Sequence, residues 1–181
     1  LAYDLGPVLG TGNFAKVRLG THRVSGRKVA VKIVEKKRFA LSHGDFSFAT
    51  LQSEVEILRK MNHKNIITMW DVFDDPRCFT MVLELVSNGD FFDYIAGRAP
   101  NPFTEPEARK LFVQLLEAML YMHDKDVVHR DLKPENILVH VDPNFSFHQT
   151  TDNQRNAPLI PVDKVTLKVT DFGLAKFCTE Q

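Results

Sequence analysis

The sequence predicts an α+β protein: a five-stranded antiparallel sheet with one helix, followed by a mainly helical part. First, the initial third of the chain consists of short apolar or β-branched runs separated by glycine-containing turns, which is typical of strands in a meander. Second, apolar residues beyond residue 100 recur with helical spacing over a long segment. At this length the chain can form one large domain or two small lobes, and either can bury a core.

Composition is that of a soluble globular protein. Lys and Arg together number 23, as do Asp and Glu, so there is neither a basic field for nucleic acid nor an acidic tail. The two cysteines are too few for a disulfide framework, which favours a reducing compartment. No apolar run approaches the roughly 18 residues of a membrane span, and the first residues lack a signal-peptide layout. We expect a soluble intracellular protein that binds neither nucleic acid nor membrane, with its oligomeric state left open.

Three strands are expected at the start of the chain, over residues 5–10, 14–19 and 28–34. The turn between the first two, from Leu9 to Val17, is close to the G-x-G-x-x-G-x-V pattern of a phosphate-covering loop, with Ala15 at the third glycine. Gly10 and Gly12 lack a Cβ, so the backbone can approach phosphate oxygens. Many hairpins carry two glycines, so this loop alone is weak evidence. A dinucleotide-binding interpretation fails because another strand follows where a helix is required.

Lys32 in the third strand is a candidate phosphate ligand. Strand alternation puts Ala30 and Lys32 on one face, so a flat base could lie on Ala30 while the ammonium reaches phosphates. A lone strand lysine is more often an exposed edge charge. A partner carboxylate at the right place would reverse that expectation.

Glu54 is the expected partner of Lys32. A helix is predicted over residues 49–61, because apolar residues recur there at i, i+4 and i+7. Glu54 shares the buried face of this helix, whereas Glu56 points towards solvent.

A second hairpin and a long helix follow. The hairpin strands are expected over residues 66–73 and 78–85. Thr104 and Glu107 form a capping box that begins the helix. One face of this helix is apolar and is expected in the core: Ala108, Leu111, Phe112, Leu115, Leu116, Met119 and Met122.

Residues 129–136 read HRDLKPEN and match the H-R-D-L-x-x-x-N pattern of a phosphoryl-transfer loop. Asp131 can accept a hydroxyl proton, Lys133 can offset phosphate charge, and Asn136 presents an oxygen to Mg²⁺. The alternative is a polar surface loop with these letters, and a match of this length is improbable by chance. His129 is expected to be packed and hydrogen-bonded, because the histidines show no metal-ligand spacing.

A further strand pair is expected at residues 137–139 and 165–169, and it leads into Asp171-Phe172-Gly173. In this triplet Asp171 offers a carboxylate for Mg²⁺ and Phe172 an apolar plug against the helix of Glu54.

The segment 141–163 between these strands is rich in Asn, Gln, Thr, Asp and Pro, which predicts a largely disordered surface insertion. Phe145 and Phe147 in this segment could form a docking patch.

These signals, in this order, resemble the catalytic domain of eukaryotic protein kinases. The resemblance covers essentially the whole chain apart from the insertion. It implies a bilobal protein-kinase-like fold, with residues 1–86 as amino-terminal lobe and hinge and residues 87–181 as a partial carboxy-terminal lobe. It also implies ATP and Mg²⁺ as cofactors, protein substrates, and a kinase domain truncated soon after Asp171.

The resemblance also assigns roles to individual residues. Catalysis would depend on Asp131, Lys133, Asn136, Lys32 and Glu54. Mg²⁺ would be held by Asn136 and Asp171. Nucleotide contacts would come from Leu9, Gly10, Gly12, Val17, Ala30, Lys32, Leu83 as gatekeeper, the backbones of Glu84 and Val86, Asp90 at the ribose, Leu138 below the adenine, and Asp171.

The DLKPEN sequence with Lys133 resembles that of serine/threonine kinases, and residues 84–95 resemble the calcium/calmodulin-dependent kinase group. The KKRFA run at residues 36–40 is similar to forkhead-associated-domain checkpoint kinases. The implied function is transfer of the γ-phosphoryl of ATP to a protein hydroxyl in checkpoint or stress signalling. Asp90 and Glu135 would favour substrates with basic residues before the target. Arg130 suggests control by activation-loop phosphorylation.

Two alternatives come from other functional classes. A chain that ends so soon after Asp171 could be inactive as an enzyme and serve as a nucleotide-binding or interaction module. Nucleic-acid binding in a damage response is the other, and the sequence has no basic stripe or stacking motif to support it.

Overall fold

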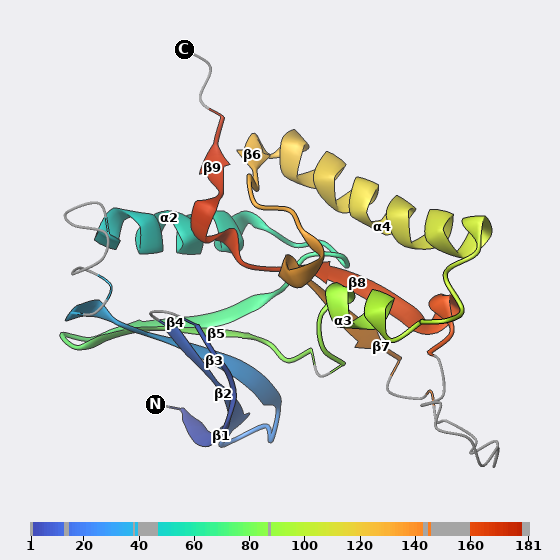
Figure 1. Cartoon of the computed structure of the whole chain (residues 1–181). Coiled ribbons are helices and arrows are strands. Elements are labelled where there is room, and N and C mark those ends of the chain that lie inside the picture. The colour runs from blue at the N-terminus through green and yellow to red at the C-terminus, as the bar shows by residue number, and fades with distance from the viewer. Residues whose placement is uncertain are drawn as a thin grey trace.

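The computed structural model describes residues 2–12, 15–37, 39, 47–86, 88–142, 145 and 160–178. It confirms the α+β class: a five-stranded antiparallel sheet is followed by a part with two helices and two small sheets (Figure 1). Of the predicted insertion, residues 143–144 and 146–159, with Phe147, lie outside the described residues. No described helix has the length and apolar character to cross a membrane.

The large sheet has the strand order β1-β2-β3-β5-β4. Its strands are β1 (Tyr3–Thr11), β2 (Ala15–His22), β3 (Lys28–Glu35), β4 (Met69–Asp74) and β5 (Cys78–Glu84). In β3, buried Val29, Val31 and Val34 mark positions where the strand packs on its neighbours. The register pairs Lys32 of β3 with Met81 of β5, which places this lysine in the middle of the sheet.

The prediction that β4 starts at residue 66 is wrong. The strand begins at Met69, because Ile66 instead forms an isolated parallel bridge with Val169. Main-chain hydrogen bonds hold that bridge: Ile67 N donates to Val169 O at 2.9 Å, and Val169 N donates to Asn65 O at 2.9 Å. The segment before β4 therefore connects the large sheet to the second part of the molecule.

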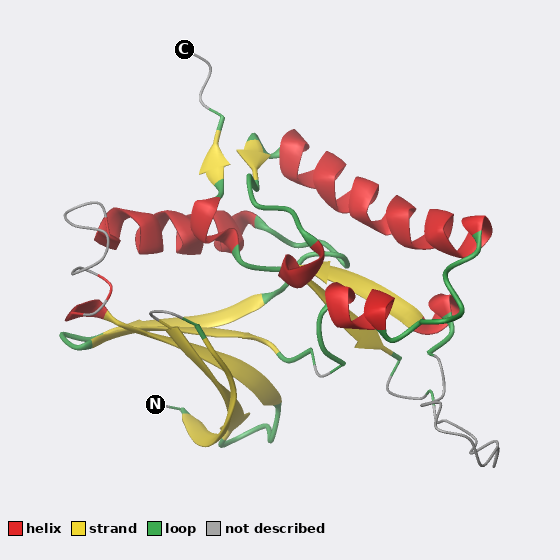
Figure 2. Cartoon of the chain, viewed as in Figure 1, coloured by secondary structure: helices red, strands yellow, loops and turns green. Residues whose placement is uncertain are grey.

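Helix α2 (Ser47–Lys60) lies over one face of the large sheet (Figure 2). Leu51, Val55 and Leu58 are buried and join a core cluster with Val34 and Met81 of the sheet. Glu54 is also buried, with 4 % of its surface exposed, while Glu56 is exposed, as the helical spacing predicted.

The second part contains α3 (Phe91–Ala96), α4 (Glu105–Asp124) and the strand pairs β6 (Val127–Val128) with β9 (Lys176–Phe177) and β7 (Ile137–Val141) with β8 (Val165–Val169). The described residues of this part also form three short 3₁₀ turns: η2 (Pro134–Asn136), η3 (Val162–Lys164) and η4 (Phe172–Leu174). In the predicted pair, Ile137 lies opposite Val169. This register brings the end of β8 next to the loop that precedes β7.

The expectation that the whole apolar face of α4 is core is only partly correct. Leu111, Ala118 and Met122 are buried, but Phe112 and Leu116 are 60 % and 41 % exposed. The described residues of other elements cover only part of the apolar stripe of α4. The covered part, which packs on β6, β7 and β8, is buried.

The predicted capping box at the start of α4 is present. Thr104 N and Oγ1 donate to Glu107 Oε2 at 2.9 Å and 2.8 Å. These hydrogen bonds, with a third from Arg98, hold the pKa of Glu107 at about 2, below its ordinary value of 4.5. The carboxylate form of Glu107 therefore stabilises the fold above its unfolded pKa.

We predict that Glu107→Gln lowers the free energy of unfolding at neutral pH and that the deficit shrinks as pH falls from about 4.5 towards about 2. The reason is that a carboxyl group with a lower pKa in the folded state stabilises the fold fully above its unfolded pKa. This contribution is lost as the pH falls towards the folded pKa and the carboxylate is protonated. Urea unfolding followed by circular dichroism at several pH values measures the difference. Glu105→Gln is the matched control, since it loses only an exposed pair with Arg109. A deficit that is constant with pH contradicts the prediction.

Candidate functional site

A cavity of about 400 Å³ lies between the large sheet and the β7–β8 pair. Its lining includes every residue predicted to contact a nucleotide except Asp90: Leu9, Gly10, Gly12, Val17, Ala30, Lys32, Leu83, Glu84, Val86, Leu138 and Asp171. Its walls are mostly apolar, and three of its charged residues, Lys32, Glu54 and Asp171, lie together, which is typical of small-molecule sites.

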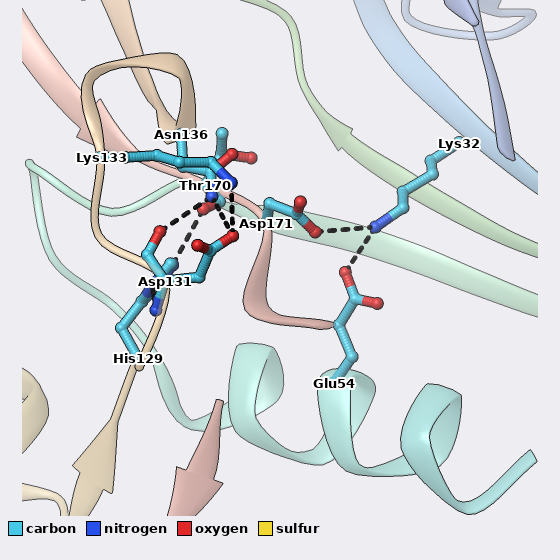
Figure 3. Close-up of polar contacts among 8 residues, drawn as sticks. All are labelled: Lys32, Glu54, His129, Asp131, Lys133, Asn136, Thr170 and Asp171. Carbon is cyan, nitrogen blue, oxygen red and sulfur yellow. Dashed lines mark hydrogen bonds and ion pairs between the residues drawn. The ribbon is translucent and has the colours of Figure 1, made fainter. Parts of the chain in front are cut away.

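Lys32 forms the predicted ion pair with Glu54. The Lys32 Nζ lies 2.7 Å from Glu54 Oε1 and 3.6 Å from Asp171 Oδ1. Three elements meet in this contact, because β3 carries the lysine, α2 the glutamate, and the segment after β8 the aspartate (Figure 3).

The net pKa shift of Lys32 is upward. Burial by itself would lower the pKa, but the charges of Glu54 and Asp171 and their hydrogen bonds outweigh it. The ammonium is therefore charged across the physiological pH range, as contact with phosphate oxygens requires.

Asp131 is held in a second cluster. Its Oδ2 accepts hydrogen bonds from Lys133 Nζ at 2.8 Å and from Asn136 Nδ2 at 2.9 Å. The hydrogen bond from Lys133 is the largest cause of a lowered pKa of Asp131; burial opposes it, and the hydrogen bond from Asn136 lowers the pKa further. The same ion pair raises the pKa of Lys133. Asp131 is thus a carboxylate that can orient a hydroxyl at neutral pH.

The backbone around Asp131 is fixed by its neighbours. His129 is 2 % exposed; its Nε2 lies 3.0 Å from Thr170 O, and its Nδ1 accepts from Asp131 N at 3.3 Å. Because a carbonyl oxygen only accepts, Nε2 carries the hydrogen in this arrangement. The expectation that His129 is a packed, hydrogen-bonded residue is confirmed.

Figure 3 shows Asp171 between the Lys32–Glu54 pair and the Asp131–Asn136 cluster. Asp171 has φ 61°, in the left-handed region that non-glycine residues seldom adopt. Phe172, 1 % exposed, packs edge-on against the His129 ring and joins the core cluster that includes α2. Its burial therefore couples the placement of Asp171 to both sides of the site.

The oxygens of Asn136 and Asp171 fit a hard cation such as Mg²⁺. Asn136 Nδ2 donates to both Asp131 O and Asp131 Oδ2 at 2.9 Å, which leaves the amide oxygen for another partner. The Asp171 side chain is 53 % exposed at the cavity. Magnesium is commonly held by one or two protein oxygens together with substrate phosphates and waters. The described residues hold no group of three or more His, Cys, Asp or Glu arranged for a metal.

Asp90 lies outside the cavity lining. It is the N-cap of α3, where its carboxylate accepts a hydrogen bond from Asp93 N at 2.8 Å. Its backbone bridges to Leu138, which does line the cavity. Its assignment to the ribose stays a prediction.

Sequence reasoning missed several residues of the site. Leu58, Ile67, Leu85 and Thr170 also line the cavity. Leu58 follows from the same helical period as Glu54, one turn later. Lys168 was also missed, although its Nζ lies 2.8 Å from Glu84 Oε1 at the edge of the cavity. A lysine within an apolar strand is the one signal that could have pointed to it.

Comparison with known proteins identifies the family. The family model described as "Protein kinase domain" matches residues 3–181. "Probable serine/threonine-protein kinase fhkD" of Dictyostelium discoideum is 40 % identical over 179 residues, which are 99 % of this chain and 21 % of that protein. "Calcium/calmodulin-dependent protein kinase type 1" of Caenorhabditis elegans is 39 % identical over 175 residues, 96 % of this chain and 43 % of that protein.

"Maternal embryonic leucine zipper kinase" of Xenopus laevis is 39 % identical over 143 residues, 79 % of this chain and 21 % of that protein. The chain thus spans between about a fifth and less than half of the length of these relatives. The family match extends over nearly all of the sequence, and the fold and the cavity described above agree with it. The chain belongs to the protein kinase domain family.

Proposed function

We propose that this chain is the ATP-binding part of a serine/threonine protein kinase that transfers the γ-phosphoryl of ATP to a protein hydroxyl. The observation that carries the proposal is the contact of Lys32 with both Glu54 and Asp171 at the end of an apolar cavity. The division into lobes at residues 86 and 87 is part of the proposal. It puts the cavity where the two lobes meet.

The nucleotide lies in this cavity. Ala30 and Leu138 sandwich the adenine, and Leu83, 9 % exposed, closes the inner end as gatekeeper. The backbones of Glu84 and Val86 hydrogen-bond the adenine edge. The glycines of the β1–β2 turn cover the phosphates, where the ideal Cβ position of Gly10 meets nothing within 4 Å and leaves room for a ligand.

Lys32 holds the α- and β-phosphates, and Glu54 keeps its ammonium in place. Mg²⁺, when bound by Asn136 and Asp171, neutralises charge that develops on the phosphate oxygens. Asp131 orients the substrate hydroxyl and accepts its proton, and Lys133 offsets phosphate charge next to it.

Two carboxylates, those of Glu135 and Asp90, support a proposal for the substrate class. Glu135 is exposed one residue before the buried Asn136, and Asp90 lies at the start of α3. We propose that these carboxylates attract basic residues that precede the target serine or threonine.

The pathway that we propose is checkpoint or stress signalling, because residues 36–40 resemble the forkhead-associated-domain checkpoint kinases. Cells that lack the protein and still arrest normally after DNA damage would contradict the pathway.

We predict that Lys32→Met and Asp171→Ala each weaken Mg²⁺-ATP binding by roughly tenfold to a hundredfold. Each change removes a charged partner of the phosphates or the cation, which is worth about 1.5–3 kcal/mol. Isothermal calorimetry on the whole chain measures the affinities. Lys28→Met is the matched control, since Lys28 is an exposed lysine on the same strand whose ammonium bonds Thr21. Equal affinity in all four proteins would exclude this cavity as the nucleotide site.

We predict that Asp131→Asn reduces the rate of peptide phosphorylation by roughly 10²–10⁴-fold, while ATP affinity changes little. Asparagine has a similar shape but cannot accept the proton. Radiolabel transfer and calorimetry, run on the same preparations, separate the two effects. ATP binding without detectable transfer in the unmodified chain would instead favour a non-catalytic nucleotide-binding module.

We predict that Glu135→Gln raises the KM for peptides with basic residues before the target several-fold, without changing the KM for neutral peptides. Removal of an exposed carboxylate weakens only the attraction to a cation. Initial rates on the two peptide sets test this. Indifference of the unmodified chain to basic residues would refute the proposed preference.

A further inference from the structure

Lys168 and Glu84 form an ion pair that the proposed reaction does not use. The Lys168 Nζ lies 2.8 Å from Glu84 Oε1 and 2.9 Å from Glu84 Oε2. The two side chains are only 11 % and 20 % exposed. This pair is therefore largely removed from water, as the Lys32–Glu54 pair is.

Three separate segments meet at Glu84. Besides Lys168, its Oε2 accepts a hydrogen bond from Thr68 N at 3.3 Å, and Glu84 N donates to Thr68 O at 2.8 Å. Glu84 ends β5 and begins the hinge segment (residues 84–86), Thr68 immediately precedes β4, and Lys168 lies within β8. The glutamate thus fixes the hinge segment to both neighbours at once.

The pair connects two walls of the cavity. The residues of the hinge segment line one side, and Leu138, which lies opposite Lys168 in the β7–β8 register, lines the other. Two and three residues after Lys168 come Thr170 and Asp171, which also line the cavity. A change in the Lys168–Glu84 contact would therefore alter the spacing between the hinge segment and Leu138 on the opposite wall of the cavity.

Stability alone is a weak reason for such a pair. Two charges lose much of their hydration on burial, and apolar residues of similar volume are often as stabilising. A geometric role accounts better for a charged contact here, because one ammonium contacts both oxygens of a carboxylate that Thr68 N also holds, which limits their separation, whereas apolar packing tolerates shifts.

We propose that Lys168 is a positioning residue that, through Glu84, sets the height of the adenine slot between the hinge segment and Leu138. The inference rests on the proposed nucleotide site. It assigns Lys168 no contact with the nucleotide and no part in phosphoryl transfer.

The test compares Lys168→Met with the double variant Glu84→Leu/Lys168→Met. The single variant leaves Glu84 buried without its cation and should lower the melting temperature. The double variant removes both charges and should recover most of that loss. Lys64→Met, which breaks the exposed pair of Lys64 with Glu117, is the matched control.

Calorimetry with two probes then separates position from stability. We expect the double variant to bind adenosine about tenfold more weakly than the unmodified chain, and Mg²⁺-tripolyphosphate equally well, because only the adenine slot has changed. The control should bind both probes normally. If adenosine affinity recovers together with the melting temperature, the pair is only structural and the inference is wrong.

The outcomes also separate this inference from the proposed function. An unmodified chain that binds neither adenosine nor Mg²⁺-tripolyphosphate overturns both. Equal loss of the two probes in the double variant means general damage to the site and overturns the positioning role alone.

Discussion

The contact of Lys32 with Glu54 and Asp171 is the interaction on which the rest of the site depends. Burial disfavours the charged form of Lys32, and the carboxylates of Glu54 and Asp171 reverse this effect. The buried ammonium therefore depends on β3, α2 and the segment after β8 coming together. These segments are held in place by the apolar packing of α2 on the sheet and by the burial of Phe172 in the same core cluster. The site is therefore a consequence of the assembled core, and no single loop contains it.

Hydrogen bonds from the main chain and from side chains join the second part of the molecule to the first and align segments within it. Asn65 and Ile67 pair with Val169, and Thr170 N donates to Asn136 O at 2.9 Å. Asn65 Nδ2 also donates to Leu167 O and Gln114 Oε1, both at 2.9 Å. These bonds align β8 with the residues before β4 and with the loop of Asp131. Such bonds are directional, so they fix the position of the Asp131–Asn136 cluster relative to the Lys32–Glu54 pair.

Local sequence patterns predict the elements and the partners that share a face, and they fail where a contact depends on distant pairing. Glu54 was placed correctly because helical spacing puts it beside Leu51 and Leu58. The Lys168–Glu84 pair spans 84 positions and follows no period, so a lysine within an apolar strand draws attention to Lys168 but does not indicate its partner. Similarly, the strand expected from Ile66 onward has a valid apolar pattern, but the main chain there pairs with Val169. The exposed part of α4, including Phe112, shows that an apolar stripe does not reveal how much of it is covered.

Two non-glycine residues of the site, Arg130 at φ 66° and Asp171 at φ 61°, lie in the left-handed region. Such conformations cost on the order of 1–3 kcal/mol each, with Asp near the low end. Arg130 Nε donates to Leu174 O at 2.7 Å, and His129 bonds Thr170 O, so each strained residue has a hydrogen bond beside it. Burial of Phe172 adds about 1.5–3 kcal/mol, which is comparable to the strain at one of the two residues, and the hydrogen bonds add to it. The cost is thus offset by contacts that join the Asp131 loop to the Asp171 segment. Loss of those contacts would release both residues, so the two segments are expected to order or disorder together.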